Sequence, residues 1–174
     1  AKDIGEAFLR WVIAGQLLIN VDYSKDIYFE YEAMVDRDRT DAYAHAVKLM
    51  AGLRLVDISR WSVQMAYAWP NYRPHMRALV AGLKQEGIDV WIVSASNEWT
   101  IRTAAPFAGI EPDQCIGIKT RVRDGLITDE LVKPVTCGPG KVDSIERNIG
   151  VKPVFAFGDS MGDFDMLEYV EFPM

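Results

Sequence analysis

The sequence predicts an α/β protein: a doubly wound parallel sheet together with a separate all-helical part. Up to position 69 the apolar residues recur at helical spacing, with polar residues between them. After position 87, short apolar runs that are typical of buried strands alternate with helical segments. The last run, 154–157, leads into a turn with two aspartates four positions apart. Because open α/β sheets bind ligands at the carboxyl ends of their strands, this turn is the first candidate site.

The helical part covers residues 1–69 and is the first predicted domain. Its apolar positions form successive stripes at intervals of three and four, so each stripe lies on one face of a helix. The tract 69–74, which contains two prolines, interrupts the pattern. We therefore expect a domain boundary there, followed by an α/β core over residues 70–174.

The core elements are predicted from their boundary residues. Pro74 suits the first turn of a helix and Gly87 its end. The dipeptide Asp124-Gly125 between alternating residues is typical of a hairpin turn. Expected in chain order are a helix over 74–86, a strand over 90–93 that ends at 94–96, a helix over 97–108, a strand over 115–118, a hairpin over 120–131, a helix over 141–148 and a strand over 154–157.

Composition limits the classes of partner. The chain has 174 residues, 49% of them hydrophobic, and can bury a substantial core. Its formal net charge of −6 argues against nucleic acid or an anionic membrane as the main partner, because such surfaces need a basic face. The first residues show no signal-peptide pattern, and no apolar run approaches membrane-spanning length. We expect a cytoplasmic location, with the periplasm as the alternative, since Cys115 and Cys137 show no pattern that decides the compartment.

Asp159 and Asp163 are the candidate metal ligands. Mg²⁺ is usually held by one or two carboxylates together with waters and a substrate phosphate. Gly158 and Gly162 would let the backbone turn sharply enough for both acids to face one ion. The alternative is that Asp163 only caps the helix that follows while Asp159 is solvated in a loop.

Two further segments are expected at the same edge of the sheet. Ser94, Ala95 and Ser96 end a predicted strand, where hydroxyl groups and the free N–H groups of the next helix would hold a phosphate oxygen. Lys141 begins a helix after a Gly-Pro-Gly turn and would place its ammonium on a phosphoryl group. The alternatives are an ordinary N-cap for the serines and a solvated surface position for the lysine.

The serine turn, the lysine and the two aspartates follow one another in an order and spacing that resemble those of the haloacid dehalogenase superfamily of phosphohydrolases. Within this superfamily the chain resembles the phosphoserine phosphatase-like branch with a helical cap. The resemblance covers residues 72–169 well and the helical part loosely. It implies that Ser94 corresponds to the family's second motif, which binds the phosphoryl group, and that Lys141 is the third-motif lysine. Asp159 and Asp163 would be the fourth-motif acids that hold Mg²⁺.

One motif of this family has no clear counterpart in the chain. The family's nucleophile is the first aspartate of Asp-x-Asp-x-Thr/Val, which follows an N-terminal strand. Asp36 begins a string, 36–40, that fits these letters, but the residues before it, 28–35, carry two glutamates and helical periodicity. We therefore expect a helix junction capped by Asp38 or Thr40, and a core that lacks both the nucleophile strand and the usual last strand.

The function expected from these residues is Mg²⁺-dependent hydrolysis of a small phosphomonoester. In the family an aspartate attacks phosphorus to give an aspartyl-phosphate, which water then hydrolyses. Mg²⁺ and Lys141 would neutralise charge on the phosphoryl oxygens, and Ser94 would help to orient them. One alternative is a dehalogenase of the same superfamily, which would not need the acidic pair. Another is a non-catalytic binder of phosphate ligands that has lost its nucleophile.

Aromatic residues near the domain boundary suggest a substrate class. Trp61, Tyr67, Trp69 and Tyr72 resemble those of family members that act on phosphocholine-like amines. Because an aromatic face attracts an alkylammonium group by about 0.5–2 kcal/mol, an amine-bearing ester such as phosphoserine or phosphocholine is expected to be favoured over a sugar phosphate. The alternative is that these rings only pack the helical part.

Overall fold

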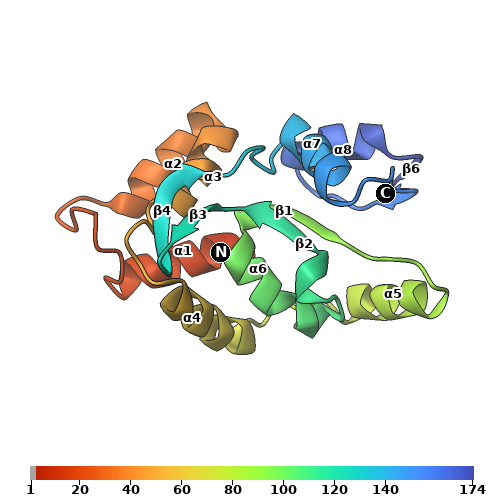
Figure 1. Cartoon of the computed structure of the whole chain (residues 1–174), viewed down its shortest axis with the longest axis horizontal. Helices are drawn as coiled ribbons and strands as arrows, with labels where there is room; N and C mark the ends of the chain where they lie inside the picture. The colour runs from red at the N-terminus through yellow and green to blue at the C-terminus, as the bar shows by residue number, and fades with distance from the viewer. Residues whose placement is uncertain (1–2) are drawn as a thin grey trace.

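The computed structural model describes residues 3–174, so residues 1–2 of the predicted helical domain lie outside the described part. Four helices occupy the first part of the chain, as its apolar periodicity predicts, and they lie together on one side of the molecule (Figure 1). These cap helices are α1 (Ile4–Ala14), α2 (Ile27–Arg37), α3 (Arg39–Lys48) and α4 (Leu55–Ala68).

An aspartate is the N-cap residue of three of these helices. Its side chain accepts a hydrogen bond from one of the backbone N–H groups that the start of a helix leaves free. Asp3 caps α1 and Asp26 caps α2. Asp38 ends α2 and also caps α3, with its carboxylate 3.0 Å from the backbone nitrogen of Asp41. The expected cap at Asp38 is confirmed, and the string 36–40 is a helix junction.

The remaining helices and strands follow the predicted alternation. Pro106 lies just beyond α6, and the helix expected over 97–108 continues there as a short 3₁₀ turn, since proline removes a helical N–H donor. The elements are α5 (Pro74–Gln85), β1 (Ile92–Asn97), α6 (Glu98–Ala104), β2 (Cys115–Ile118), β3 (Thr120–Arg123), β4 (Leu126–Leu131), α7 (Pro139–Asn148), β5 (Phe155–Ala156), α8 (Phe164–Tyr169) and β6 (Phe172–Pro173), with 3₁₀ turns at Ala105–Ala108, Pro112–Gln114 and Met161–Asp163.

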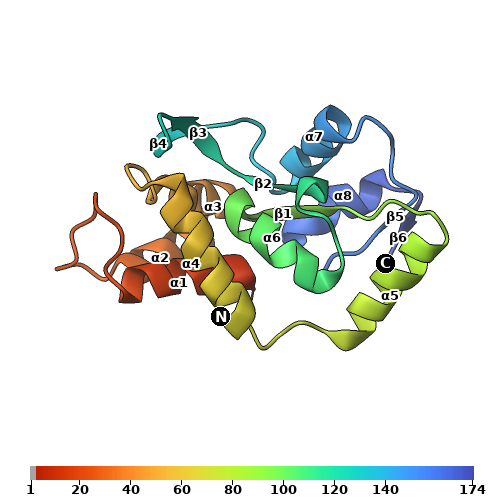
Figure 2. The ribbon, with the colours of Figure 1, turned by 60° about the horizontal axis from the view of Figure 1, so that its bottom comes forward.

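The α/β class is confirmed, with the described strands arranged as three separate pairs. β1 and β2 are parallel, as are β5 and β6, while β3 and β4 form an antiparallel hairpin. The hairpin turns at the expected dipeptide, where Asp124 and Gly125 have φ angles of 51° and 78°. Figures 1 and 2 both show α6 and α7 on opposite sides of the β1–β2 pair. No helix within residues 3–174 is long and apolar enough to cross a membrane.

The hairpin packs against the cap helices although it belongs to the second half of the chain. Ile127 of β4 is 1% exposed and lies in the cluster that also contains Phe8 and Ile58. Its backbone carbonyl accepts a hydrogen bond from Gly52 at 2.8 Å, and its N–H donates to Leu53 at 2.9 Å. The buried core of the cap is thus completed by a segment from the predicted α/β part.

Candidate active site

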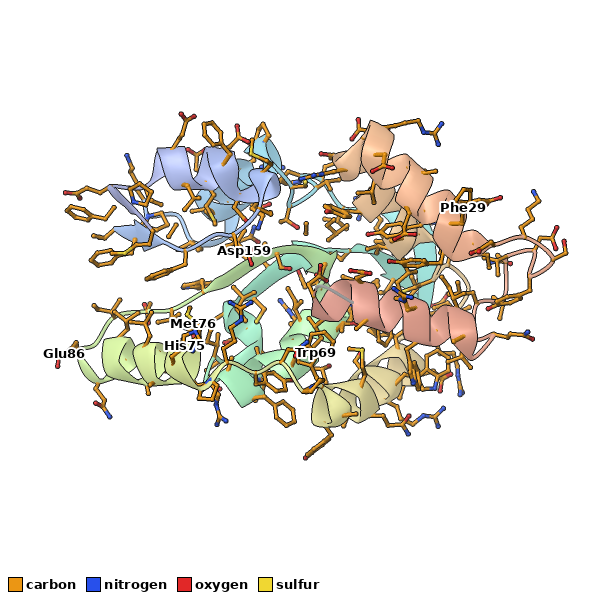
Figure 3. The ribbon with its side chains drawn as sticks, turned by 180° about the vertical axis from the view of Figure 1, so that it is seen from behind. Phe29, Trp69, His75, Met76, Glu86 and Asp159 are labelled. Atoms are coloured by element: carbon orange, nitrogen blue, oxygen red, sulfur yellow. The ribbon has the colours of Figure 1, made fainter. Side chains whose placement is uncertain are left out.

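A cavity of about 730 Å³ lies between the cap and the core. One wall comes from α1, α2 and α3, and the other from β1, α7 and the turn after β5. Figure 3 shows Asp159 of this turn between β1 and the α7–α8 pair. The structure brings all the predicted site residues to this cavity: Ser94, Ala95, Ser96, Lys141, Asp159 and Asp163.

Lys141 is a buried cation with two acceptors. It is 5% exposed, so the alternative of a solvated surface lysine is wrong. Its Nζ donates to the carbonyl oxygen of Val93 at 2.6 Å and to Oδ1 of Asp163 at 2.7 Å. The first turn of α7 approaches the preceding loop closely, since a Cβ on Gly140 would stand 1.9 Å from the oxygen of Val135. This close approach fixes the helix start that carries the lysine.

Asp163 is held as an anion by its neighbours. Besides Lys141 at Oδ1, its Oδ2 accepts hydrogen bonds from the backbone nitrogen of Ser160 at 3.1 Å and from the Ser160 hydroxyl at 2.8 Å. Burial alone would raise the pKa of this carboxyl, but the hydrogen bonds from Lys141 and Ser160 outweigh it and hold the pKa below its ordinary value. Both carboxylate oxygens are therefore engaged by the protein.

Asp159 differs from Asp163 in having an open carboxylate. It is exposed, lines the cavity, and has no hydrogen-bond or ion-pair partner within residues 3–174. No group of three His, Cys, Asp or Glu side chains in the same range is arranged to hold a metal. One open carboxylate still fits Mg²⁺, because this ion usually keeps several waters and takes one or two protein carboxylates with a substrate phosphate.

The turn that carries the two acids requires only one of its glycines. A Cβ on Gly158 would lie 2.5 Å from the Cβ of Asp163, so the approach of the backbone to that side chain needs glycine there. At Gly162 the nearest atoms would be 3.5 Å away, an ordinary contact. Of the two glycines expected to let the backbone turn sharply, the close approach therefore requires Gly158 and does not require Gly162.

The serine tract lies within β1, and another residue caps the following helix. Asn97 accepts a hydrogen bond from the backbone nitrogen of Thr100 at 2.9 Å, so the alternative of a serine N-cap is wrong. The Ser94 hydroxyl accepts from the nitrogen of Ser96 at 3.1 Å, and Thr136 donates to the Ser94 carbonyl at 2.6 Å. As an acceptor in that bond, the Ser94 hydroxyl keeps its own hydrogen to donate to a ligand.

Sequence reasoning missed the residues that the cap contributes to the cavity. They come from successive turns of α1, α2 and α3, and the only sequence signal is that the α3 members share one helical face. Burial raises the pKa of the two tyrosines among them, Tyr31 and Tyr43, so both phenols are neutral at pH 7. The polar and aromatic cap residues on the cavity are Asp3, Glu6, Tyr31, Arg39 and Tyr43.

None of the four aromatic residues predicted to select the substrate lines this cavity. Trp61 packs against the core of the cap, and Tyr67 is 76% exposed with its ring 5.0 Å from that of Phe107. Trp69 and Tyr72 line a second cavity of about 700 Å³, and Figure 3 shows Trp69 near α4 and apart from Asp159. These rings belong to the cap and its connection to the core.

Comparisons with known proteins identify the fold. The sequence model of the haloacid dehalogenase-like hydrolases matches residues 1–168. A protein of unknown function from Bordetella pertussis matches with a TM-score of 0.78 and 17% identity, over 97% of this chain and 81% of that chain. A phosphoserine phosphohydrolase-like protein from Francisella tularensis matches with a TM-score of 0.64 and 16% identity, over 98% of this chain and 79% of that chain.

A conserved protein of unknown function from Anaerococcus prevotii matches with a TM-score of 0.63 and 22% identity, over 70% of this chain. The chain spans only 42% of the length of that protein. The comparison with curated proteins found no match. Because the structural matches have low identity, they establish the shared fold and leave the chemistry to be argued from the site.

Proposed function

We propose that this chain, which belongs to the haloacid dehalogenase-like hydrolases, catalyses the Mg²⁺-dependent hydrolysis of a small phosphomonoester. The observation that carries the proposal is Lys141, a buried ammonium paired with Asp163 in one cavity with Ser94 and Asp159. Catalysis of phosphoryl transfer consists mainly of positioning and of stabilising charge on the phosphoryl oxygens. In this cavity the Ser94 hydroxyl can position a phosphoryl group, and the Lys141 ammonium can stabilise the charge on its oxygens.

Each residue of the cavity has a distinct task in this proposal. The Ser94 hydroxyl donates to a phosphoryl oxygen, and Lys141 neutralises charge on the same group. Asp163 acts as a positioning residue, because its hydrogen bond fixes the lysine ammonium. Asp159 would hold Mg²⁺, which when bound supplies Lewis-acid polarisation of the phosphoryl group.

The proposed reaction also requires a nucleophilic aspartate in addition to Asp159 and Asp163. Asp36 is exposed near the end of α2 and does not line the cavity. We propose that the nucleophile enters on an additional parallel strand between β1 and β5. Val93 of β1 packs in one cluster with Ala156 of β5, yet the two strands belong to different sheets, so each has an edge open to pairing.

The reaction then balances as follows. A carboxylate oxygen of that aspartate attacks phosphorus, and the new O–P bond forms as the ester O–P bond breaks; the leaving alkoxide takes a proton from solvent water and departs as the alcohol. Water next attacks the acyl-phosphate, releasing inorganic phosphate and restoring the carboxylate. Lys141 keeps its ion pair with Asp163 throughout.

The test compares the 174-residue chain with a longer form that includes the residues encoded before Ala1. Both are assayed with p-nitrophenyl phosphate and Mg²⁺. We expect turnover from the longer form only, abolished by EDTA and by Lys141→Ala but not by replacing the exposed Lys152 with alanine. Turnover by the 174-residue chain would refute the added strand. No turnover by the longer form would refute the phosphatase.

An amine-bearing substrate class is supported by the acidic and aromatic cap residues. Asp3, Glu6, Tyr31 and Tyr43 all line the cavity, and both carboxylates and aromatic faces attract an ammonium group. We propose that phosphoethanolamine is a better substrate of the longer form than 2-hydroxyethyl phosphate, which replaces the ammonium with a hydroxyl. Equal kcat/KM for the two esters would refute this preference.

A further inference from the structure

The strand that carries Ser94 is irregular at that residue. β1 pairs with β2 at Val93, and the next paired residue of β1 is Asn97. These two residues lie four steps apart along β1, but their partners, Ile116 and Ile118, lie only two steps apart along β2. Such an irregularity re-aims side chains and is common beside active sites. The direction of the Ser94 hydroxyl therefore depends on the groups that hold this part of β1 in place.

Thr136 holds the irregular segment from the loop before α7. Its hydroxyl donates to the Ser94 carbonyl at 2.6 Å, and the residue is 1% exposed. The N–H of Cys137 donates to the carbonyl of Val135 at 2.8 Å, which makes Thr136 the central residue of a three-residue turn. Both neighbours of Thr136 are buried in one apolar cluster, against which Ala95 of β1 packs. The Thr136 hydroxyl is thus fixed at the Ser94 carbonyl.

The backbone and the side chain of Ser94 are held by different groups. The carbonyl accepts from Thr136, and the hydroxyl oxygen accepts from the backbone nitrogen of Ser96 at 3.1 Å. With these two bonds in place, the hydroxyl hydrogen remains for a ligand in the cavity that Ser94 lines. Thr136 itself does not line this cavity. Any effect of Thr136 on a ligand therefore passes through the segment that it holds.

We propose that Thr136 is a positioning residue, which sets the Ser94 hydroxyl in place to bind a phosphoryl oxygen. This inference rests on the proposed phosphomonoester hydrolysis. Lys141 makes the neighbouring contact, because its Nζ donates to the Val93 carbonyl at 2.6 Å. Two successive carbonyls of β1 are thus bound by side chains from α7 and the loop before it. One contact fixes the cation and the other fixes the hydroxyl donor, so both groups are set relative to the same strand.

The experiment measures the affinity of the longer form for inorganic phosphate by calorimetry in the presence of Mg²⁺. The variant is Thr136→Val, which removes the hydroxyl and leaves the side chain nearly the same size. It is made in the unaltered protein and also together with Ser94→Ala, so that the two losses can be compared. Thr136→Ser keeps a hydroxyl donor. The control is Thr128→Val, because Thr128 donates to the Arg121 carbonyl at 2.8 Å within the hairpin and does not line the cavity.

We expect Thr136→Val to weaken phosphate binding about tenfold, as the loss of one hydrogen bond to a charged group does. In the Ser94→Ala protein the same substitution should change the affinity by less than about twofold, since the hydroxyl that Thr136 positions is then absent. Thr136→Ser and Thr128→Val should each bind phosphate within about twofold of the unaltered protein. If Thr136→Val does not fold, Thr136→Cys, whose thiol is a weaker donor of similar size, takes its place in the same comparison.

Equal losses from Thr136→Val with and without the Ser94 hydroxyl would overturn the inference, because a merely structural role weakens binding in both proteins. Unchanged affinity in Thr136→Val, or a loss of the same size in Thr128→Val, would overturn it as well. In each of these cases, phosphate binding by the unaltered longer form would still support the proposed function. If that form binds no phosphate, the proposed function and this inference both fail.

Discussion

Replacing Lys141 with methionine tests whether the buried ion pair of the site also stabilises the core. The side chains of Lys141 and Asp163 are only 6% and 12% exposed, with 2.7 Å between the charged atoms. Removing one partner of a buried pair leaves the other charge uncompensated, which typically costs about 3–5 kcal/mol. We expect Lys141→Met to lower the free energy of unfolding by that amount, a large part of the stability of an ordinary domain.

A second ion pair of the chain provides the matched control. Arg123 and Glu130 are as close, at 2.6 Å, but their side chains are 65% and 45% exposed. Because water screens exposed charges, Arg123→Met should cost about 0–1 kcal/mol. The assay is urea unfolding at pH 7 in EDTA, followed by circular dichroism. With a slope of about 2 kcal/mol per molar urea, a loss of 3–5 kcal/mol lowers the midpoint by about 1.5–2.5 M.

The double variant separates the lost charge balance from lost packing. In Lys141→Met combined with Asp163→Asn no charge remains buried at this point, so the midpoint should recover part of the loss seen in Lys141→Met alone. The reasoning is refuted if Lys141→Met shifts the midpoint no further than Arg123→Met. It is also refuted if the double variant unfolds at a lower urea concentration than Lys141→Met, because adding Asp163→Asn would then have destabilised the protein further.

Three further predictions follow from the same region. In EDTA, the stability that Asp163 supplies should be fully present above about pH 4, where an unfolded aspartate is ionised, and lost as pH falls through its depressed folded pKa; a urea midpoint independent of pH below 4 would contradict this. In the longer form, Asp159→Asn should raise the Mg²⁺ concentration needed for half-maximal activity, whereas Asp163→Asn should mainly lower kcat; equal Mg²⁺ requirements in both variants would contradict the division of roles. Gly140→Ala should destabilise by about 1–3 kcal/mol because its Cβ would meet the Val135 oxygen at 1.9 Å, whereas Gly82→Ala in α5, with nothing within 4 Å, should stabilise by about 0.5–1 kcal/mol; equal urea midpoints would contradict both.

The parts of the fold that local signals determine were predictable. Pro74 marks the first residue of α5, and the Asp124-Gly125 turn joins β3 to β4, because each residue type favours one backbone conformation. The packing of the hairpin on the cap was not predictable. Ile127 is apolar and lies in a predicted strand, but this does not show which core it joins, since a strand pattern carries no information on its tertiary partner.

The candidate site shows the same division between position and partner. Strand ends and helix starts place Ser94, Lys141 and the two aspartates at one cavity, as the topology of an α/β sheet predicts. The sequence does not show that Lys141 bonds to Asp163, because a spacing of 22 residues fits many contacts. The sequence also does not show that Arg39 lines the cavity, because an exposed arginine on an amphipathic helix has the pattern of an ordinary surface residue.

The pairing of Lys141 with Asp163 has a consequence for how two cations share one substrate. Moving Asp163 onto a metal would break its bond to the lysine and leave the buried ammonium with only the Val93 carbonyl, at the cost of an unbalanced buried charge. We therefore expect Asp163 to stay with Lys141 and offset its charge, and the open carboxylate of Asp159 to be the ligand left for Mg²⁺. In the proposed reaction both cations then face one phosphoryl dianion, and their mutual repulsion is reduced because each has a carboxylate of its own.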